Sequence, residues 1–374
     1  MEQKRNTGID LLRIIAAFMV LILHILGQGG LLKALPVKAV SFKVGWSLEY
    51  LCFCAVNCFG LISGFSGFHS RDSYGRILRS WLQVFFFAVG GAVVMHLYKP
   101  VLVKEETIKL ALLPVINKKY WYYTAYFCIA FFMPAMNRMV KAMEKRQLQL
   151  FIIGGAILLS VIPTFANKDL FYTNNGYSPI WLAYLYVVGG YLAKYPLKLH
   201  PFKCFLIYLL GVFLTCMNKF YPDFFESMKD ISLAKYTSPT ILVCAIFLLA
   251  GLAQCKFHKF FQKIIHFVAP LSFATYLLHA QGPVYGYFME SKFGKIAREG
   301  SLTIVLRVFA IALGWFLLGI AIDFVRDKLF KLIGVPKLCK KIDVCVDKFL
   351  SKPEKPLVQE VSAPAPEAAE NKES

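Results

Sequence analysis

The stretch "RIIAAFMVLILH" (residues 13–24) is an apolar run with an arginine at one end and a histidine at the other. It lies within a longer apolar block, 9–28, which matches the roughly 20 residues that a helix needs to cross a bilayer. Ionisable side chains are costly in hydrocarbon and usually face the interior of a helix bundle. The stretch therefore predicts a membrane helix with two polar groups turned inward.

The rest of the chain repeats this apolar pattern. Of 374 residues, 57% are hydrophobic and 17% charged, with a mean hydropathy of +0.56. Soluble domains are nearer half apolar and a quarter charged. The sequence predicts an all-α polytopic membrane protein with about ten transmembrane helices, at 9–28, 46–66, 80–98, 120–137, 149–166, 180–193, 203–219, 238–254, 264–288 and 301–325.

The charge pattern indicates lipid as a partner and argues against nucleic acid. The net charge is +20, but the basic residues form short patches between apolar blocks, which suits anionic lipid. Basic clusters such as 71–79 favour cytoplasmic segments. With an even number of spans, both termini are then expected in the cytoplasm.

Three regions are expected along the chain. Residues 1–325 form the membrane domain, and 326–350 form a basic, partly amphipathic cytoplasmic segment suited to an anionic leaflet. Residues 351–374 are rich in Pro, Ala and Glu and are expected to be a disordered tail. The ten cysteines show no metal-ligand spacing, so we expect small buried side chains and no metal site.

Arg13 and His24 lie on one face of the first predicted helix. Eleven residues at 100° each return to within about 20° of the start, about 16 Å further along the axis. The bland alternatives are an arginine that snorkels to the interface and a histidine that only bonds a neighbouring helix.

A second polar face occurs in "LSFATYLLHA" (271–280), where Ser272, Tyr276 and His279 fall within about 60° of one another on a helical wheel. Helix–helix contact is the simpler explanation for the serine and tyrosine. His24 and His279 each lie fifteen residues from the inner end of their spans, about 22 Å deep in a core about 30 Å thick. Two histidines at one depth can converge.

Two further stretches carry candidate binding residues. "AVNCFGLISGF" (55–65) contains Asn57 and Ser63 among glycines, and close helix packing is the alternative reading. "KYWYYTAYF" (119–127) contains Trp121 and Tyr122, which could line an acceptor site or belong to an interfacial aromatic belt.

Taken together, the chain resembles the acyltransferase-3 family of integral-membrane acyltransferases, which includes many bacterial polysaccharide O-acetyltransferases. Its motifs occur in order between residue 8 and about residue 325 as "GIDLLRIIAAFMVLILH", "AVNCFGLISGFSGF", "KYWYYTAYFCIAFFMPAM", "YLYVVGGYLAKY" and "LSFATYLLH". The resemblance implies ten helices in a bacterial plasma membrane, a cytoplasmic acyl-CoA donor and an acceptor at the outer face.

Under this resemblance the polar residues receive roles in acetyl transfer. A histidine suits the base that takes a hydroxyl proton, with His24 first and His279 second. Tyr276 or Ser272 would orient a histidine or stabilise the oxyanion. The acetyl-CoA co-substrate would meet Arg13, Arg71, Arg76 and Arg79. The acceptor, a glycan or lipid-linked sugar, would contact Asn57, Ser63, Trp121 and Tyr122.

Several alternatives stay open at this point. Transfer could be direct, or it could pass through an acyl-histidine or acyl-serine. The acyl group could be succinyl, and the sequence indicates no oligomeric state. A polytopic transporter or exporter of a glycan precursor or small solute would also use intramembrane histidines, as proton relays. A non-catalytic membrane scaffold gives no reason for polar groups at matched depth.

Overall fold

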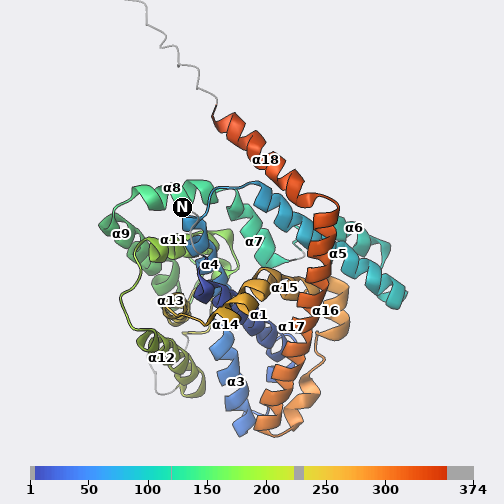
Figure 1. The fold of residues 1–374 in the computed structure, drawn as a ribbon. Coiled ribbons are helices and arrows are strands. Elements are labelled where there is room, and N and C mark those ends of the chain that lie inside the picture. Colours follow the sequence, from blue (N-terminus) through green and yellow to red (C-terminus); the bar gives the residue numbers. More distant parts are fainter. Residues whose placement is uncertain (1–4, 119, 223–230, 352–374) are drawn as a thin grey trace, which may run out of the picture.

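A computed structural model describes residues 5–118, 120–222 and 231–351, in which all regular structure is helical (Figure 1). Residues 352–374 of the predicted tail lie outside the described residues. The α-helices are α1 (Thr7–Leu26), α2 (Leu31–Ala34), α3 (Val40–Cys52), α4 (Ala55–His69), α5 (Gly75–Tyr98), α6 (Glu105–Leu112), α7 (Trp121–Ala130), α8 (Met133–Ala142), α9 (Lys145–Ala156), α10 (Ile162–Phe165), α11 (Pro179–Lys194), α12 (Pro201–Phe220), α13 (Pro239–Ala253), α14 (Lys259–Val268), α15 (Phe273–His279), α16 (Gly282–Phe288), α17 (Ser301–Leu332) and α18 (Val335–Leu350). Short 3-10 helices at Pro100–Leu102, Asn174–Gly176, Ala269–Leu271 and Gly294–Arg298 and a π-helix at Ile157–Val161 join them.

Several helices are long and apolar enough to cross a bilayer. Among the described residues there are six such stretches, or seven if one bent pair counts as a span. The all-helical, multi-pass prediction is confirmed, whereas the count of ten is not. The predicted spans 120–137, 180–193 and 238–254 hold helices of only 10 to 16 residues, shorter than the roughly 20 residues that usually cross a bilayer.

The predicted ninth span, 264–288, is not one continuous helix, and here the expectation was wrong. α14 ends at Val268, and α15 begins at Phe273 after a bend of 40°. Pro270 in the intervening turn lacks an N–H group and cannot continue an α-helical hydrogen-bond ladder. Ser272 therefore lies at the break, as the N-cap residue immediately before the helix that carries His279.

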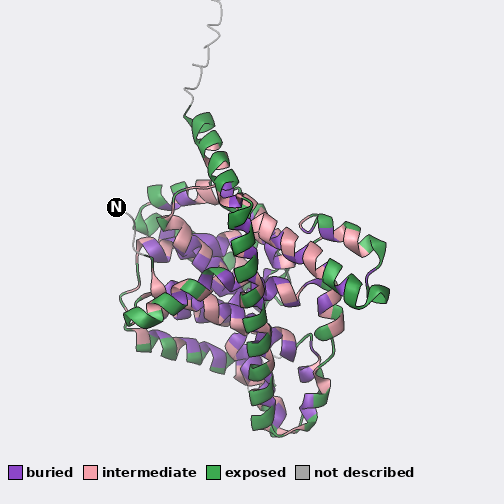
Figure 2. Cartoon of the chain, turned by 45° about the vertical axis from the view of Figure 1, so that its right-hand side comes forward, coloured by how far each residue is buried: buried purple, intermediate pink, exposed green. Residues whose placement is uncertain are grey.

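α1 forms the centre of the bundle. It packs against α4, α13, α17 and α3, and residues such as Leu12, Leu21 and Ile25 are fully buried. Figure 2 shows the buried residues gathered inside, while α17 exposes one side along its length. That side carries large apolar residues, including Leu306, Leu313 and Leu317. An apolar outer face of this kind is suited to lipid.

Among the described helices, α4 and α11 make the most extensive contact, and their backbones approach closely. A Cβ atom added to Gly64 would lie 1.8 Å from the backbone oxygen of Tyr186, and one added to Gly189 would lie 2.1 Å from that of Leu61. Small residues let helix backbones approach in this way. Since the obstructing atoms are backbone, neither contact can be relieved by a side-chain rotation.

We expect Gly64→Ala to destabilise the protein strongly. Overpacking usually costs about 1–3 kcal/mol, and here two helices must separate. The measurement is the thermal unfolding midpoint in detergent. Gly90→Ala is the matched control because a Cβ there meets no atom within 4 Å. Equal midpoints for the two variants would contradict the packing argument.

α17 continues through the predicted domain boundary at 325, and Arg326 is buried within it. The following helix, α18, is amphipathic: Val335 and Cys339 are buried against Phe330, while Lys340 and Lys341 are exposed. In Figure 1 α18 projects beyond the bundle. Its suggested contact with anionic lipid stays a prediction.

Candidate active site

The structure brings His24 and His279 together in the core. His24 lies in the last turn of α1, and His279 is the last residue of α15. Their Nδ1 and Nε2 atoms, respectively, are 2.6 Å apart, and Nδ1 of His279 is 2.5 Å from the carbonyl oxygen of Thr275. Both distances lie within hydrogen-bond range. The predicted ninth span is broken, but its second part, α15, still brings His279 next to His24.

This chain of contacts fixes the tautomer of the neutral pair. The Thr275 carbonyl can only accept, so Nδ1 of His279 must donate to it. Nε2 of neutral His279 is then an acceptor, and Nδ1 of His24 donates to it. Nε2 of His24 consequently keeps its lone pair free. A histidine oriented in this way by a second group has the arrangement of a general base.

Two cavities adjoin along α1. The smaller, of ≈ 30 Å³, is lined by His24 and Tyr276, and the larger, of ≈ 320 Å³, by Arg13 and Arg76. Both cavities share the side chains of Phe59, Tyr122 and Phe273 as lining. These three residues therefore separate the histidine end from the arginine end.

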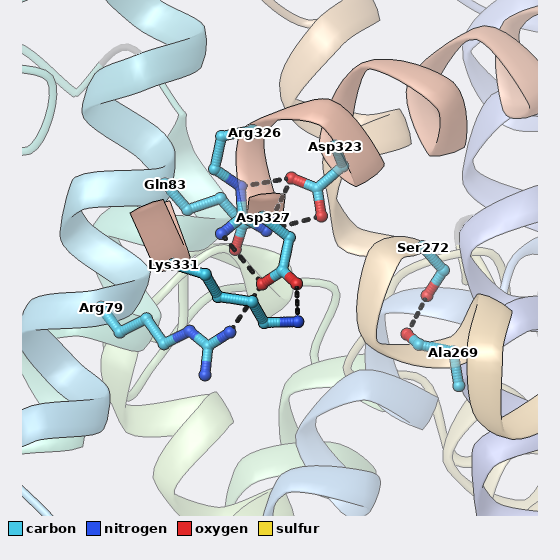
Figure 3. Close-up of polar contacts among 8 residues, drawn as sticks. All are labelled: Arg79, Gln83, Ala269, Ser272, Asp323, Arg326, Asp327 and Lys331. Atoms are coloured by element: carbon cyan, nitrogen blue, oxygen red, sulfur yellow. Dashed lines mark hydrogen bonds and ion pairs between the residues drawn. The ribbon is translucent and has the colours of Figure 1, made fainter. Parts of the chain in front are cut away.

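Tyr276 and Ser272 both line the smaller cavity but are placed differently. The ring centre of Tyr276 is 6.4 Å from that of His24 and 6.1 Å from that of His279. The Ser272 hydroxyl donates to the carbonyl of Ala269 at 2.9 Å (Figure 3). Its proton is thus committed to the backbone, whereas Tyr276 belongs to the histidine cluster.

Arg13 is held by the buried carboxylate of Asp10. Its guanidinium lies 2.9 Å from that carboxylate, and Arg5 pairs with the same group. Two cations share one anion, which leaves the site with surplus positive charge. Since Arg13 also lines the larger cavity, this charge is available to an anionic ligand.

Only two of the four arginines predicted to bind the donor lie at the larger cavity. Arg13 and Arg76 line the larger cavity, while Arg71 and Arg79 do not. Arg71 pairs with Asp347 of α18 at 2.6 Å, and its side chain is 82% exposed. Arg79 enters an ionic network between α5 and α17, drawn in Figure 3 with Gln83, Asp323, Arg326, Asp327 and Lys331.

The residues predicted to bind the acceptor lie at different places in the structure. Asn57 is buried and uses both ends of its amide, donating to the Tyr236 carbonyl and accepting from the Trp181 indole. Ser63 lines the larger cavity, and Trp121 lines the smaller one. The arrangement of Asn57 is that of a packing residue.

The larger cavity has polar residues that the sequence did not single out. Tyr186 of α11 donates to Asn137 of α8 at 2.9 Å, and Asn137 in turn donates to Asp72 at 3.3 Å. All three line the cavity. They come from three elements far apart in the chain, so no spacing marks them. In the sequence, Tyr186 lies within the motif "YLYVVGGYLAKY", and Asn137 directly follows the motif "KYWYYTAYFCIAFFMPAM". Nothing else in the sequence distinguishes them.

Comparison with known proteins adds one finding. A family model described as an acyltransferase domain, Acyl_transf_3, matches residues 6–325. That range contains both cavities and both histidines. No curated protein and no solved structure matches the chain.

Proposed function

Since the chain belongs to the acyltransferase-3 family and is a multi-pass membrane acyltransferase, we propose that it transfers an acetyl group from cytoplasmic acetyl-CoA to a hydroxyl of a cell-surface or lipid-linked glycan. We further propose ten spans in a bacterial plasma membrane, three of them short, with both termini in the cytoplasm. One observation carries the reaction: an oriented histidine and a partly neutralised arginine line adjoining cavities along one helix.

The two cavities suggest how the donor lies. Its phosphate groups would meet Arg13 and Arg76 in the larger cavity. The pantetheine arm would pass Tyr122, Phe59 and Phe273. The thioester would then reach His24, about 16 Å along α1 from Arg13.

Transfer then requires one base and one oxyanion partner. Nε2 of His24 takes the proton of the acceptor hydroxyl while the oxygen of that hydroxyl attacks the thioester carbonyl. Tyr276 lines the same cavity as His24, and its hydroxyl would stabilise the tetrahedral oxyanion. The carbon–sulfur bond breaks, and His24 returns the proton to the departing CoA thiolate.

The test is CoA release by the purified protein, followed with a thiol reagent. We expect release from acetyl-CoA that depends on a glycan acceptor, and loss of acetyl groups from the surface glycans of cells that lack the gene. Acceptor movement across a proteoliposome without CoA release would overturn the proposal in favour of a transporter.

We expect Arg13→Gln to raise the KM for acetyl-CoA by about 10–100-fold, because a hydrogen bond to a charged group contributes about 1.5–3 kcal/mol. The value of kcat should change little, since Arg13 lies far from the thioester. Steady-state kinetics measure both. Arg138→Gln is the matched control, as Arg138 is exposed on α8 and does not line the cavity. An unchanged KM in Arg13→Gln would contradict the placement of the donor.

A further inference from the structure

α18 lies outside residues 6–325, the range that matches the family, yet it contacts the wall of the larger cavity. Its buried residues Val335 and Cys339 pack with Phe330 of α17, and Leu78 and Leu82 of α5 lie against them. In Figure 1 α18 follows the end of α17 and then projects beyond the bundle. The contact fixes α18 to the first turns of α5.

A single carboxylate joins α18 to the start of α5. One oxygen of Asp343 accepts from the backbone N–H of Gly75 at 2.8 Å, and the other accepts from the Ser73 hydroxyl at 2.8 Å. The Ser73 oxygen in turn accepts from the backbone N–H of Arg76 at 3.2 Å. Unpaired N–H groups at a helix start favour a negative charge. Asp343 therefore caps α5 from the other end of the chain.

The absence of a side chain at Gly75 makes this approach possible. A Cβ atom there would lie 2.3 Å from the backbone oxygen of Cys339 and 3.0 Å from a carboxylate oxygen of Asp343. The backbone of α18 cannot give way without moving the whole helix. Gly75 and Asp343 thus support the same contact independently, one by shape and one by hydrogen bonding.

The residues held in this way belong to the cavity that we assign to the donor. Ser73, Tyr74, Arg76 and Ile77 all line it, and so does Asp72. Arg76 is one of the two arginines at this cavity, and its position follows from where α5 begins. A shift of the first turn of α5 would therefore move a cation away from the donor phosphates.

We propose that α18 acts as a C-terminal clamp that holds residues 72–77 in place and so sets the affinity for the nucleotide-bearing acyl donor. Asp343 is a positioning residue and touches no reacting atom. The clamp is separate from the histidine pair, so it affects donor binding and leaves the chemical step unchanged. This inference rests on the proposed function.

The test compares steady-state kinetics of full-length variants. In Asp343→Ala and Gly75→Ala the KM for acetyl-CoA should rise about tenfold, which corresponds to the loss of one helix cap. The inhibition constant of free CoA should rise in parallel, while kcat per folded molecule stays within about twofold of the wild-type value. Asp343→Asn is the milder variant for the case in which Gly75→Ala does not fold.

Asp347→Asn is the matched control. Its carboxylate is one turn further along α18 and pairs with Arg71 at the surface, and such exposed pairs contribute little. A purely structural role for Asp343 would lower the unfolding temperature and the folded yield without changing KM, and that result would overturn the clamp. A wild-type protein that neither binds acetyl-CoA nor releases CoA would overturn the proposed function and the clamp together.

Discussion

His24→Ala should lower kcat for acetyl transfer by about 10²–10⁴-fold, the usual contribution of a general base. The KM for acetyl-CoA should stay close to the wild-type value, because the donor phosphates are assigned to the other cavity. His24 is the residue of the pair with a free lone pair at Nε2, and it lines the smaller cavity. Removing its ring therefore removes the proton acceptor and leaves the arginine end intact.

CoA release under saturating acceptor measures this effect. The variant must elute as the wild-type protein does on size exclusion and must retain its unfolding temperature. His96→Ala is the control, because His96 is an exposed histidine of α5 that lines neither cavity. A folded His24→Ala protein that acetylates at the wild-type rate would rule out His24 as the base.

The same variant separates direct transfer from an acyl-enzyme. Wild-type protein incubated with labelled acetyl-CoA and no acceptor retains label only if a covalent intermediate forms. Of the two candidate carriers, Ser272 has its hydroxyl committed to the Ala269 carbonyl, whereas Nε2 of His24 is free. Label that is retained by the wild type and by Ser272→Ala but lost in His24→Ala would therefore indicate an acyl-histidine.

The sequence predicted an all-helical, multi-pass chain and placed the two histidines at one depth, because both expectations depend on local quantities. Apolar length places the helices, and depth along a helix places His24 and His279 at the same level. The expected depth of His279 required one continuous helix over 264–288, but in the structure this helix is broken at Pro270. The two histidines still meet because α15 packs against α1 and carries His279 into the buried core.

Side-chain direction could not be predicted in the same way. Arg71, Arg76 and Arg79 form one basic cluster in the sequence, but only Arg76 lines the cavity. The other two are drawn to carboxylates of α17 and α18, about 250 or more residues away. Partners at such distances depend on tertiary packing, which no spacing in a single sequence records. The same holds for the contact between Asp343 and Gly75.

The second large effect is expected at His279. His279→Leu should lower kcat by about 10² or more, since losing the group that fixes a catalytic histidine's tautomer can cost up to about 10⁴-fold. Without an acceptor beside it, Nδ1 of His24 no longer has to carry the proton, and the ring can also turn away from the cavity. KM for acetyl-CoA should again change little. CoA release is the measurement, with the folded fraction determined as for His24.

Glutamine variants at both positions distinguish the base from the group that orients it. In His279→Gln the amide oxygen can still accept from Nδ1 of His24, so part of the lost kcat should return relative to His279→Leu. In His24→Gln the lost kcat should not return, because an amide cannot take a proton at neutral pH. The opposite order, with partial activity in His24→Gln and none in His279→Gln, would exchange the two roles and make His279 the base.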